Sequence, residues 1–262
     1  MRLFARRPAP SAASRRVRVW GLGFCLAMLA ATLLQTPAAA AEFSPSQRRE
    51  IEAIIRDYLT KNPDVMLDAL QAAKDQMESQ SRDKAAAALI SRRHDLYDDP
   101  DTPVAGNPRG DVSIVEFFDY RCPYCKQVEP SLERLLRDDR NLRFLYKEFP
   151  VLGPESLTAA KAALAARKQG KYAALHQALM ALKGHITDAM VLQTAGSVGL
   201  DLERLKRDMQ APEIDRILKA NNELAEALDI RGTPGFVIGD EIVPGAVSLE
   251  HLKQLIDTAR HK

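Results

Sequence analysis

The sequence predicts an α/β protein in which helices cover a small sheet, preceded by a helical N-terminal extension. Three observations predict this class. The mostly apolar run Val112–Phe118 suits a central strand. The elements that follow it read as helix, strand, helical block, hairpin and helix. The chain before it shows helical periodicity, and its 262 residues are enough to bury one or two cores.

Composition excludes several classes of protein. Hydrophobic residues make up 46% of the chain and charged residues 27%, which is ordinary for a globular protein. Collagen, wholesale disorder and a multi-span membrane protein are therefore set aside. Three cysteines are too few for a disulfide-dense scaffold, so we expect chemistry from them.

Residues 1–41 predict a secretory signal peptide. They hold six arginines and no acidic residue, then the apolar stretch 19–34 and the small residues 38–41. The predicted cut precedes Glu42 or lies one residue earlier. The alternative is an uncleaved anchor, because the uncharged stretch is just long enough to span a bilayer. Export by a bacterial-style signal indicates the periplasm.

Cleavage would change both the charge and the cysteine count. The net charge falls from +2 to −4, so no cationic surface remains to predict nucleic-acid binding. Cys25 is removed, and the exported chain keeps Cys122 and Cys125. An oxidising compartment permits a disulfide between them.

Residues 42–97 predict a helical region. The segment 44–47, Ser-Pro-Ser-Gln, has the residues of a capping box with proline at the first helical position. An apolar stripe follows, made of Ile51, Ile54, Ile55, Tyr58 and Leu59. Asn62-Pro63 starts a second helix with its own stripe, Met66, Leu70, Ala73 and Met77. Because a helix pair buries little by itself, residues 45–95 either join copies in a homo-oligomer or pack against their own chain.

Residues 98–110 are rich in Asp, Pro and Gly, and we predict a linker and entry to the sheet there. The domain at 111–262 then has a second strand over Leu142–Phe149 and helices over about 155–228. Short strands at Phe236–Ile238 and Glu241–Val243 flank Gly239-Asp240, which predicts a hairpin. Ser248 caps a last helix.

The pair Cys122-Pro123-Tyr124-Cys125 stands where a strand ends and a helix begins. This spacing on a first helical turn brings two sulfurs within bonding range. The first sulfur faces unpaired amide N–H groups and the positive end of the helix dipole, which lowers its pKa. We therefore predict that Cys122 attacks and that the deeper Cys125 resolves the mixed disulfide.

Three other interpretations of the pair remain. A structural disulfide would close only a tiny loop and contribute little. Zinc needs two further ligands, and the five histidines (94, 176, 185, 251 and 261) show no paired spacing. The pair could also be inert thiols. We expect His176 and His185 to be surface residues or satisfied helix residues.

Two motifs carry a family resemblance. Residues 115–126, VEFFDYRCPYCK, resemble the active-site segment of DsbA-like thiol-disulfide oxidoreductases with a thioredoxin fold. Residues 231–236, RGTPGF, resemble the family's loop that ends in a cis-proline. The helical block resembles the family's insertion, and the N-terminal helices resemble those of the ScsC (suppressor of copper sensitivity) subgroup.

The resemblance implies roles for further residues. The Thr233-Pro234 bond is cis and lies against the cysteines, and the backbone of Thr233 pairs with an extended client peptide. The alternative is an ordinary trans turn. Glu116 is a buried carboxylate that exchanges a proton with Cys125, or else its head reaches solvent at the strand end. Independently of the resemblance, Lys147 either pairs with Glu116 across neighbouring strands or is solvated.

The predicted function is that of an exported protein disulfide oxidoreductase or isomerase that needs no cofactor. Its partners are cysteine-containing client proteins and a membrane or soluble redox partner. Tyr124 replaces the histidine of the family's strong oxidases, and Thr233 with the helical extension resembles isomerase or reductase members. The alternatives are a Cu(I)-handling protein that uses Cys122 and Cys125 as soft ligands, and a glutaredoxin, which shares the Cys-Pro-Tyr-Cys string.

Overall fold

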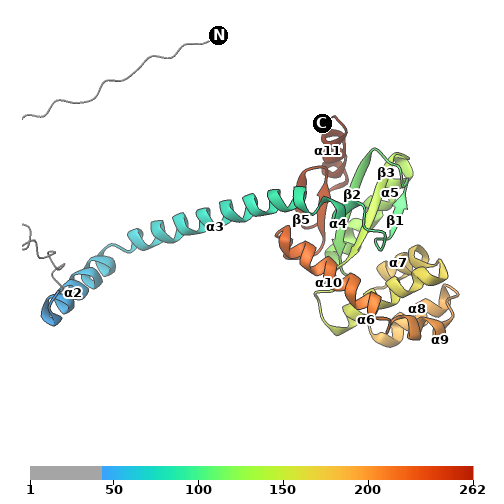
Figure 1. Cartoon of the computed structure of the whole chain (residues 1–262), viewed down its shortest axis with the longest axis horizontal. Coiled ribbons are helices and arrows are strands. Elements are labelled where there is room, and N and C mark those ends of the chain that lie inside the picture. Colours follow the sequence, from blue (N-terminus) through green and yellow to red (C-terminus); the bar gives the residue numbers. More distant parts are fainter. Residues whose placement is uncertain (1–42, 262) are drawn as a thin grey trace, which may run out of the picture. The chain divides into compact units, whose positions relative to one another are not determined.

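The structure is a computed structural model that describes residues 43–261 (Figure 1). The predicted signal peptide, its cleavage site and Cys25 lie outside the described residues. The chain divides into two compact units, Met1–Ala69 and Leu70–Lys262. None of the helices within residues 43–261 combines the length and apolar character of a membrane span.

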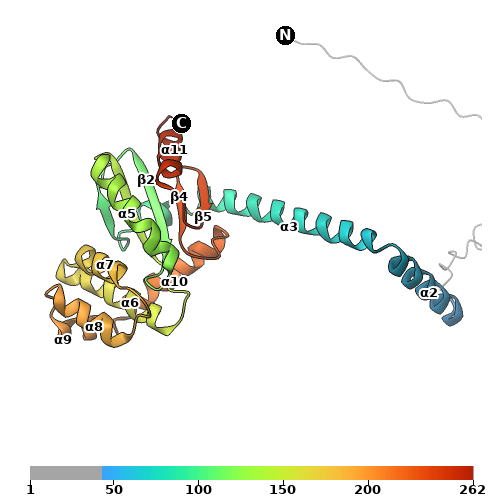
Figure 2. The same ribbon diagram turned by 180° about the vertical axis from the view of Figure 1, so that it is seen from behind.

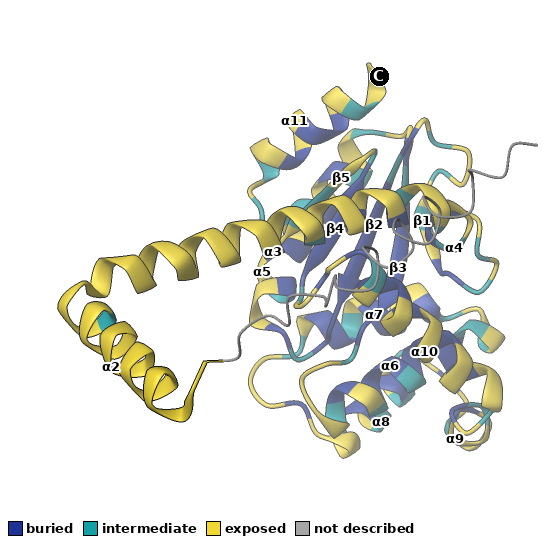
Figure 3. Ribbon diagram, turned by 60° about the vertical axis from the view of Figure 1, so that its left-hand side comes forward, coloured by how far each residue is buried: buried dark blue, intermediate teal, exposed yellow. Residues whose placement is uncertain are grey.

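The first unit contains α2 (Pro45–Lys61) and the start of α3 (Pro63–Ser91). The capping box is confirmed: the Gln47 amide donates to the Ser44 hydroxyl, and the Ser44 amide donates to the Gln47 side chain. The apolar stripe of α2 is exposed, with Ile54 and Ile55 each more than half accessible. Figure 3 shows that α2 is accessible along almost its whole length.

The second unit is built on a five-stranded sheet in the order β1-β3-β2-β4-β5. The strands are β1 (Val104–Gly106), β2 (Val112–Phe118), β3 (Leu142–Glu148), β4 (Gly235–Ile238) and β5 (Glu241–Pro244). β2 pairs in parallel with β3 and antiparallel with β4. The predicted central strand is therefore confirmed, as is the hairpin of β4 and β5.

Alternation along β2 divides the core into two layers. Ile114 and Phe118 face the larger hydrophobic cluster, whereas Val115 and Phe117 face a second cluster on the opposite side of the sheet. Because both faces are covered, six of the seven residues of β2 are buried. This explains why the strand is apolar almost throughout, with Glu116 as its one acidic residue.

Helices cover both faces of the sheet (Figure 2). The helices α5 (Pro123–Asp138) and α11 (Leu249–Arg260) pack on the larger cluster. The end of α3, the short α4 (Arg93–Tyr97) and the end of α10 (Pro212–Ala227) supply residues to the second cluster. The predicted helical block lies between β3 and β4. Before α10 it contains α6 (Pro154–Ala166), the 3₁₀ turn Arg167–Gln169, α7 (Tyr172–Ala181), α8 (Asp188–Ser197) and α9 (Leu202–Asp208).

The region around the predicted linker takes part in the compact unit. Leu96 and Tyr97 of α4 are buried in the second cluster. Residues 98–110, for which we predicted a linker and entry to the sheet, contain the edge strand β1. The compact unit therefore begins well before residue 98, within α3.

Candidate active site

The cysteine motif follows β2 directly, and one buried carboxylate holds the turn between them. Asp119 accepts hydrogen bonds from the amide of Arg121 at 2.7 Å and from the hydroxyl of Ser156 at 2.8 Å. It also accepts from the amides of Val151 and Leu152, at 2.9 and 3.0 Å. The carboxylate thus joins the turn before Cys122 to the loop and helix that follow β3.

Cys122 is the N-cap residue of α5, with Pro123 at the first helical position. Its sulfur lies 3.1 Å from the carbonyl oxygen of Thr233, to which the thiol donates. A hydrogen bond from the Cys125 thiol, together with the Thr233 side chain and the amides of Cys125 and Tyr124, lowers the pKa of Cys122 to about 6. The predicted lowering of this pKa is present, but the Cys125 thiol contributes more to it than the amides at the helix start.

Cys125 has the opposite electrostatic environment. The residue is fully buried, whereas Cys122 is 3% exposed and the neighbouring Tyr124 is 59% exposed. Its contact with the Cys122 sulfur, its burial and the nearby Glu116 all raise the pKa of Cys125. Both cysteines are free thiols in this structure. One sulfur therefore favours the thiolate and the other retains its proton.

The Thr233–Pro234 peptide bond is cis, which confirms that prediction. The loop that carries it runs from the end of α10 to β4 and brings Thr233 against Cys122, 111 residues earlier in the chain. The carbonyl of Pro234 accepts a hydrogen bond from the Gly245 amide at 2.8 Å. Gly235 is required after the proline, because a Cβ there would lie 2.6 Å from the Ile230 side chain.

Glu116 is fully buried in the middle of β2. Neither carboxylate oxygen has a hydrogen-bond partner among the described residues. Burial first, and then the charges of Glu129, Cys122 and Glu148, raise its pKa well above the ordinary value. The alternative in which its head reaches solvent is wrong, and its charge acts on Cys125. Burial therefore favours the protonated form of this carboxyl group.

The predicted pairing of Lys147 with Glu116 is wrong, and so is the solvated alternative. The parallel register of β2 and β3 sets Lys147 opposite Phe117, whereas Glu116 is opposite Tyr146. Lys147 therefore belongs to the other face of the sheet. There its buried ammonium donates to the Asp99 carboxylate at 2.9 Å and to the Thr102 hydroxyl at 2.6 Å.

A buried polar network next to the site was missed from the sequence. The carboxylate of Glu148 accepts hydrogen bonds from the hydroxyls of Tyr120 and Tyr172, each at 2.9 Å. The Tyr120 hydroxyl is also 3.0 Å from His176 Nδ1. Burial raises the pKa of Glu148 well above its ordinary value. An acidic residue in an apolar strand, the signal that identified Glu116, also marks Glu148.

The histidines are placed largely as predicted. His176 is buried in α7 and bonded to Tyr120, as expected for a helix residue with a partner, and its Nε2 lies 3.6 Å from Glu129. His185 is exposed beside Arg121. Across residues 43–261, no three His, Cys, Asp or Glu side chains are grouped so that they could hold a metal ion.

Residues 113–257 match the DsbA-like thioredoxin domain, and residues 47–80 match the N-terminal domain of the copper resistance protein ScsC. A thioredoxin-like oxidoreductase from Silicibacter pomeroyi DSS-3 is 48% identical, with a TM-score of 0.64, covering 65% of this chain and 98% of that one. ScsC of Proteus mirabilis in a transitional conformation is 30% identical, with a TM-score of 0.62, covering 84% and 99%.

The chain matches its sequence relatives over very different shares of their lengths. A stretch of 184 residues is 31% identical to Na⁺/H⁺ antiporter NhaA 1 of Salinispora arenicola, covering 67% of this chain. The match spans only 28% of that antiporter's length. A probable disulfide bond formation protein D of Bacillus anthracis is 25% identical, covering 58% of this chain and 75% of the relative. The match over residues 113–257 and the Silicibacter structure place this chain in the DsbA-like thioredoxin family, with an N-terminal domain of the ScsC type.

Proposed function

We propose that this protein is a thiol-disulfide oxidoreductase that acts on the cysteines of client proteins. The observation that carries the proposal is the Cys122 sulfur. It stands at the start of α5, beside Cys125 and 3.1 Å from the Thr233 carbonyl, with its pKa lowered to about 6. A thiol with this pKa is largely thiolate at neutral pH, and the thiolate is the nucleophile of disulfide exchange.

The reaction needs only the two cysteines of the chain. The Cys122 thiolate attacks a client disulfide, forms a mixed disulfide and releases one client thiolate. Cys125 then loses its proton and attacks the Cys122 sulfur, which releases the second client thiolate and leaves a Cys122–Cys125 disulfide. The client gains two electrons and this protein loses two. The reverse sequence oxidises a client dithiol, and no cofactor takes part.

Three residues support this chemistry in our proposal. Glu116 accepts the proton of Cys125, because its buried carboxyl group acts electrostatically on that thiol. The backbone of Thr233 pairs with the extended client, since the ladder of β4 begins only at Gly235. Pro234 presents no N–H group to the thiolate beside it.

Insulin reduction and the refolding of scrambled ribonuclease test the activity, with Cys122→Ser as the control. We expect reductase or isomerase activity in the wild type, because Tyr124 stands between the cysteines and Thr233 precedes the cis-proline. Equal rates for the wild type and the variant would refute the proposed enzymatic activity. The reduction potential of the Cys122/Cys125 pair against glutathione then ranks oxidation, isomerisation and reduction on one scale.

We also propose the organisation around this activity. Residues 1–41 direct export to the periplasm and are removed, and exposed helical surface within residues 42–97 mediates self-association. Residues 98–110 lead into the catalytic domain at 111–262, against which the end of α3 and the helix α4 pack. Export would place the protein in an oxidising compartment, where protein disulfides form and persist. N-terminal sequencing of the protein recovered from a periplasmic extract tests the cleavage. A product that begins at Met1 would contradict it.

The exposed stripe of α2 supports the homo-oligomer within residues 45–95. Ile54, Ile55 and Tyr58 are each more than half exposed, which is unfavourable unless another copy covers them. Light scattering of the wild type and of an Ile54→Asp/Ile55→Asp variant tests this. We expect a larger mass for the wild type than for the variant. Identical monomeric masses would refute self-association.

A second function, Cu(I) handling, is supported by two observations. Cys122 and Cys125 are free thiols next to one another, and soft thiolates suit Cu(I). Residues 47–80 match the N-terminal domain of a copper resistance protein. An anaerobic titration of the reduced protein with Cu(I) tests it. Failure to bind one equivalent would end this proposal.

A further inference from the structure

The ammonium group of Lys126 is held at the end of α7. Lys126 follows Cys125 in α5, and its Nζ donates to three backbone carbonyl groups where α7 ends. The acceptors are Leu179, Met180 and Leu182, at 3.0, 3.2 and 2.6 Å. Carbonyl groups in the last turn of a helix have no partner within that helix, and this end of the helix dipole favours a cation. Lys126 therefore joins the catalytic helix to the inserted helices.

The three contacts fix both the charge and the position of this half-buried group. A lysine side chain has three N–H donors when it is protonated. Each donor meets one carbonyl oxygen, so the ammonium is held in place. Burial lowers the pKa of Lys126, whereas the charges of Cys125 and Asp119 act in the opposite direction. A fixed positive charge therefore acts on the resolving cysteine.

The resolving step requires negative charge on Cys125. This sulfur is fully buried, which disfavours the thiolate. In the mixed disulfide the Cys122 sulfur is bonded to the client and carries no charge, so Glu116 of β2 remains as an acidic neighbour that raises the pKa of Cys125. A backbone hydrogen bond at Asp119 and the attraction to Lys126 favour the thiolate instead.

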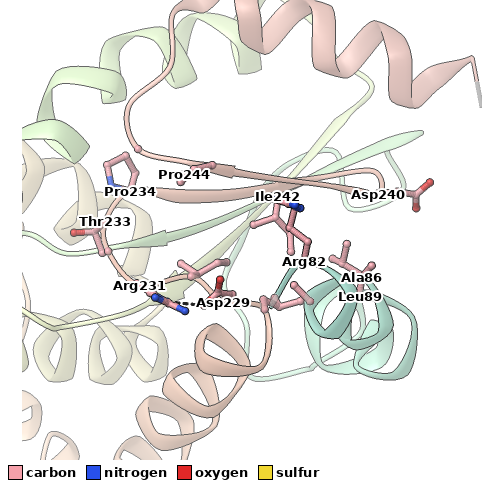
Figure 4. Close-up of a pocket in the computed structure, with 15 residues that line it drawn as sticks. Arg82, Ala86, Leu89, Asp229, Arg231, Thr233, Pro234, Asp240, Ile242 and Pro244 are labelled. Atoms are coloured by element: carbon pink, nitrogen blue, oxygen red, sulfur yellow. Dashed lines mark hydrogen bonds and ion pairs between the residues drawn. The ribbon is translucent and has the colours of Figure 1, made fainter. Parts of the chain in front are cut away.

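The attacking cysteine depends on other groups. The Cys122 sulfur contacts the loop that carries Thr233 and Pro234, which Figure 4 shows between α10 and β4. The lowering of its pKa comes from the Cys125 thiol, from Thr233 and from the amides at the helix start. The charge of Lys126 should therefore matter for resolution more than for attack.

We propose that Lys126 assists the resolving step, in which its ammonium, anchored by the carbonyl groups at the end of α7, stabilises negative charge on the Cys125 sulfur. Cys125 loses its proton, its thiolate bonds to the Cys122 sulfur, and the client thiolate departs. Lys126 forms no bond and transfers no proton, so it is a positioning residue. The inference rests on the proposed function and assigns a further residue to its second step.

A single turnover of the reduced protein with oxidised glutathione separates the two steps. Attack by Cys122 forms a glutathione adduct, and attack by Cys125 then releases the glutathione from it. Rapid acid quenching and intact-mass spectrometry give the rate constants for formation and decay of this adduct. Both steps are thus measured in one reaction.

Lys126→Gln removes the charge but keeps two N–H donors for the carbonyl groups of α7. We expect the adduct to form at the wild-type rate and to decay about three- to tenfold more slowly. A rise of about 1 in the pKa of Cys125 lowers its thiolate fraction tenfold, and the greater nucleophilicity of that thiolate offsets part of the loss. Lys126→Arg keeps the charge and should restore the decay.

Lys171 offers a matched control at the opposite end of α7, whose ten residues span about 15 Å. Its ammonium donates to the carbonyl groups of Val198 and Gly199, each at 2.8 Å. Lys171→Gln should therefore change neither rate constant. Urea unfolding of each variant measures its structural effect. If Lys126→Gln does not fold, Lys126→Met repeats the test and should slow the decay by a similar factor.

Several results would overturn the inference. Equal decay in the wild type and Lys126→Gln would do so, with adduct formation in both still upholding the proposed function. Equal slowing of formation and decay would do so too, because a loosened helix would explain both. Decay in Lys126→Arg as slow as in Lys126→Gln would exclude a role for the charge. Failure of the wild type to form any adduct would instead refute the proposed function.

Discussion

The thiol of Cys122 donates a hydrogen bond to the carbonyl oxygen of Thr233, across 111 residues of sequence and 3.1 Å of space. The contact brings the start of α5 against the loop that leads into β4. In the proposed reaction, a client peptide that lies along Thr233 presents its own sulfur beside the sulfur that attacks it. The loop that carries Thr233 thus both contacts the nucleophile and helps to lower its pKa.

The first prediction concerns the pH dependence of Cys122. Alkylation of the reduced protein by iodoacetamide should rise with a midpoint near pH 6, because the thiolate is the reactive form. Mass spectrometry of peptides containing Cys122 gives the rate at each pH. Cys125 should react far more slowly throughout, since its pKa is raised. A single midpoint near pH 8.5, the ordinary pKa of cysteine, would contradict this.

The same shift predicts how the stability of the reduced protein varies with pH. The folded pKa of Cys122 is lower than the unfolded one, so its contribution is complete above the unfolded pKa. It is lost as the pH falls toward 6. Urea unfolding should therefore show the wild type gaining stability over Cys122→Ser between pH 6 and about 8.5. If the difference in free energy of unfolding between the wild type and Cys122→Ser stayed constant from pH 6 to about 8.5, Cys122 would not have a lowered pKa in the folded protein.

Cys125 should set the pKa of Cys122 and resolve its mixed disulfides. The Cys125 thiol is the largest cause of the lowered pKa of Cys122, so Cys125→Ala should move that pKa back toward its ordinary value. The variant should also accumulate mixed disulfides with clients, because no second sulfur resolves them. Non-reducing gels and intact-mass spectrometry detect these adducts. Cys122→Ser, as the matched control, should yield none.

Replacing the buried carboxyl group should separate catalysis from stability. Glu116→Gln should slow the resolution of the mixed disulfide by about 10²-fold, the lower range for loss of a proton acceptor. It should also stabilise the protein at pH 7. The raised pKa means that ionised Glu116 is unfavourable when folded, and this penalty disappears below the unfolded pKa. Single-turnover kinetics and urea unfolding measure both effects, and Glu223→Gln on the exposed side of α10 should change neither.

The Asp119 carboxylate should be a major source of local stability. It is buried and accepts four hydrogen bonds, so Asp119→Ala leaves buried donors unpaired at a cost of about 2–4 kcal/mol. Urea unfolding measures the loss. The exposed Asp138→Ala in α5 serves as the control and should change stability by less than about 1 kcal/mol. Equal losses for both variants would contradict the role of Asp119.

Much of the fold follows from local patterns. Val112–Phe118 is the central strand, Ser44 and Ser248 cap helices, and the Gly239-Asp240 turn joins β4 to β5. Each depends on residues close together in sequence, where periodicity and capping act directly. The Cys122 motif was placed correctly for the same reason, because its chemistry comes from one helical turn.

The errors concern contacts between distant segments. Lys147 was expected either to pair with Glu116 or to be solvated. A strand register cannot be obtained from either strand alone, and the observed register places Lys147 on the opposite face of the sheet from Glu116. Three of the four donors to Asp119 lie 32–37 residues further along the chain, and the two donors to Glu148 lie 28 residues before it and 24 residues after it. Local patterns do not show which distant donor will meet a carboxylate, so both networks were missed.

The four hydrogen bonds to Asp119 bear on protein engineering. This side chain fixes the entry to the catalytic helix and also the beginning of the inserted helices, so the aim of the nucleophile depends on a remote loop. Grafting only the four-residue redox motif onto another scaffold would leave the sulfur without that anchor. A transplant designed to retain its reactivity should carry the aspartate together with the loop that it holds.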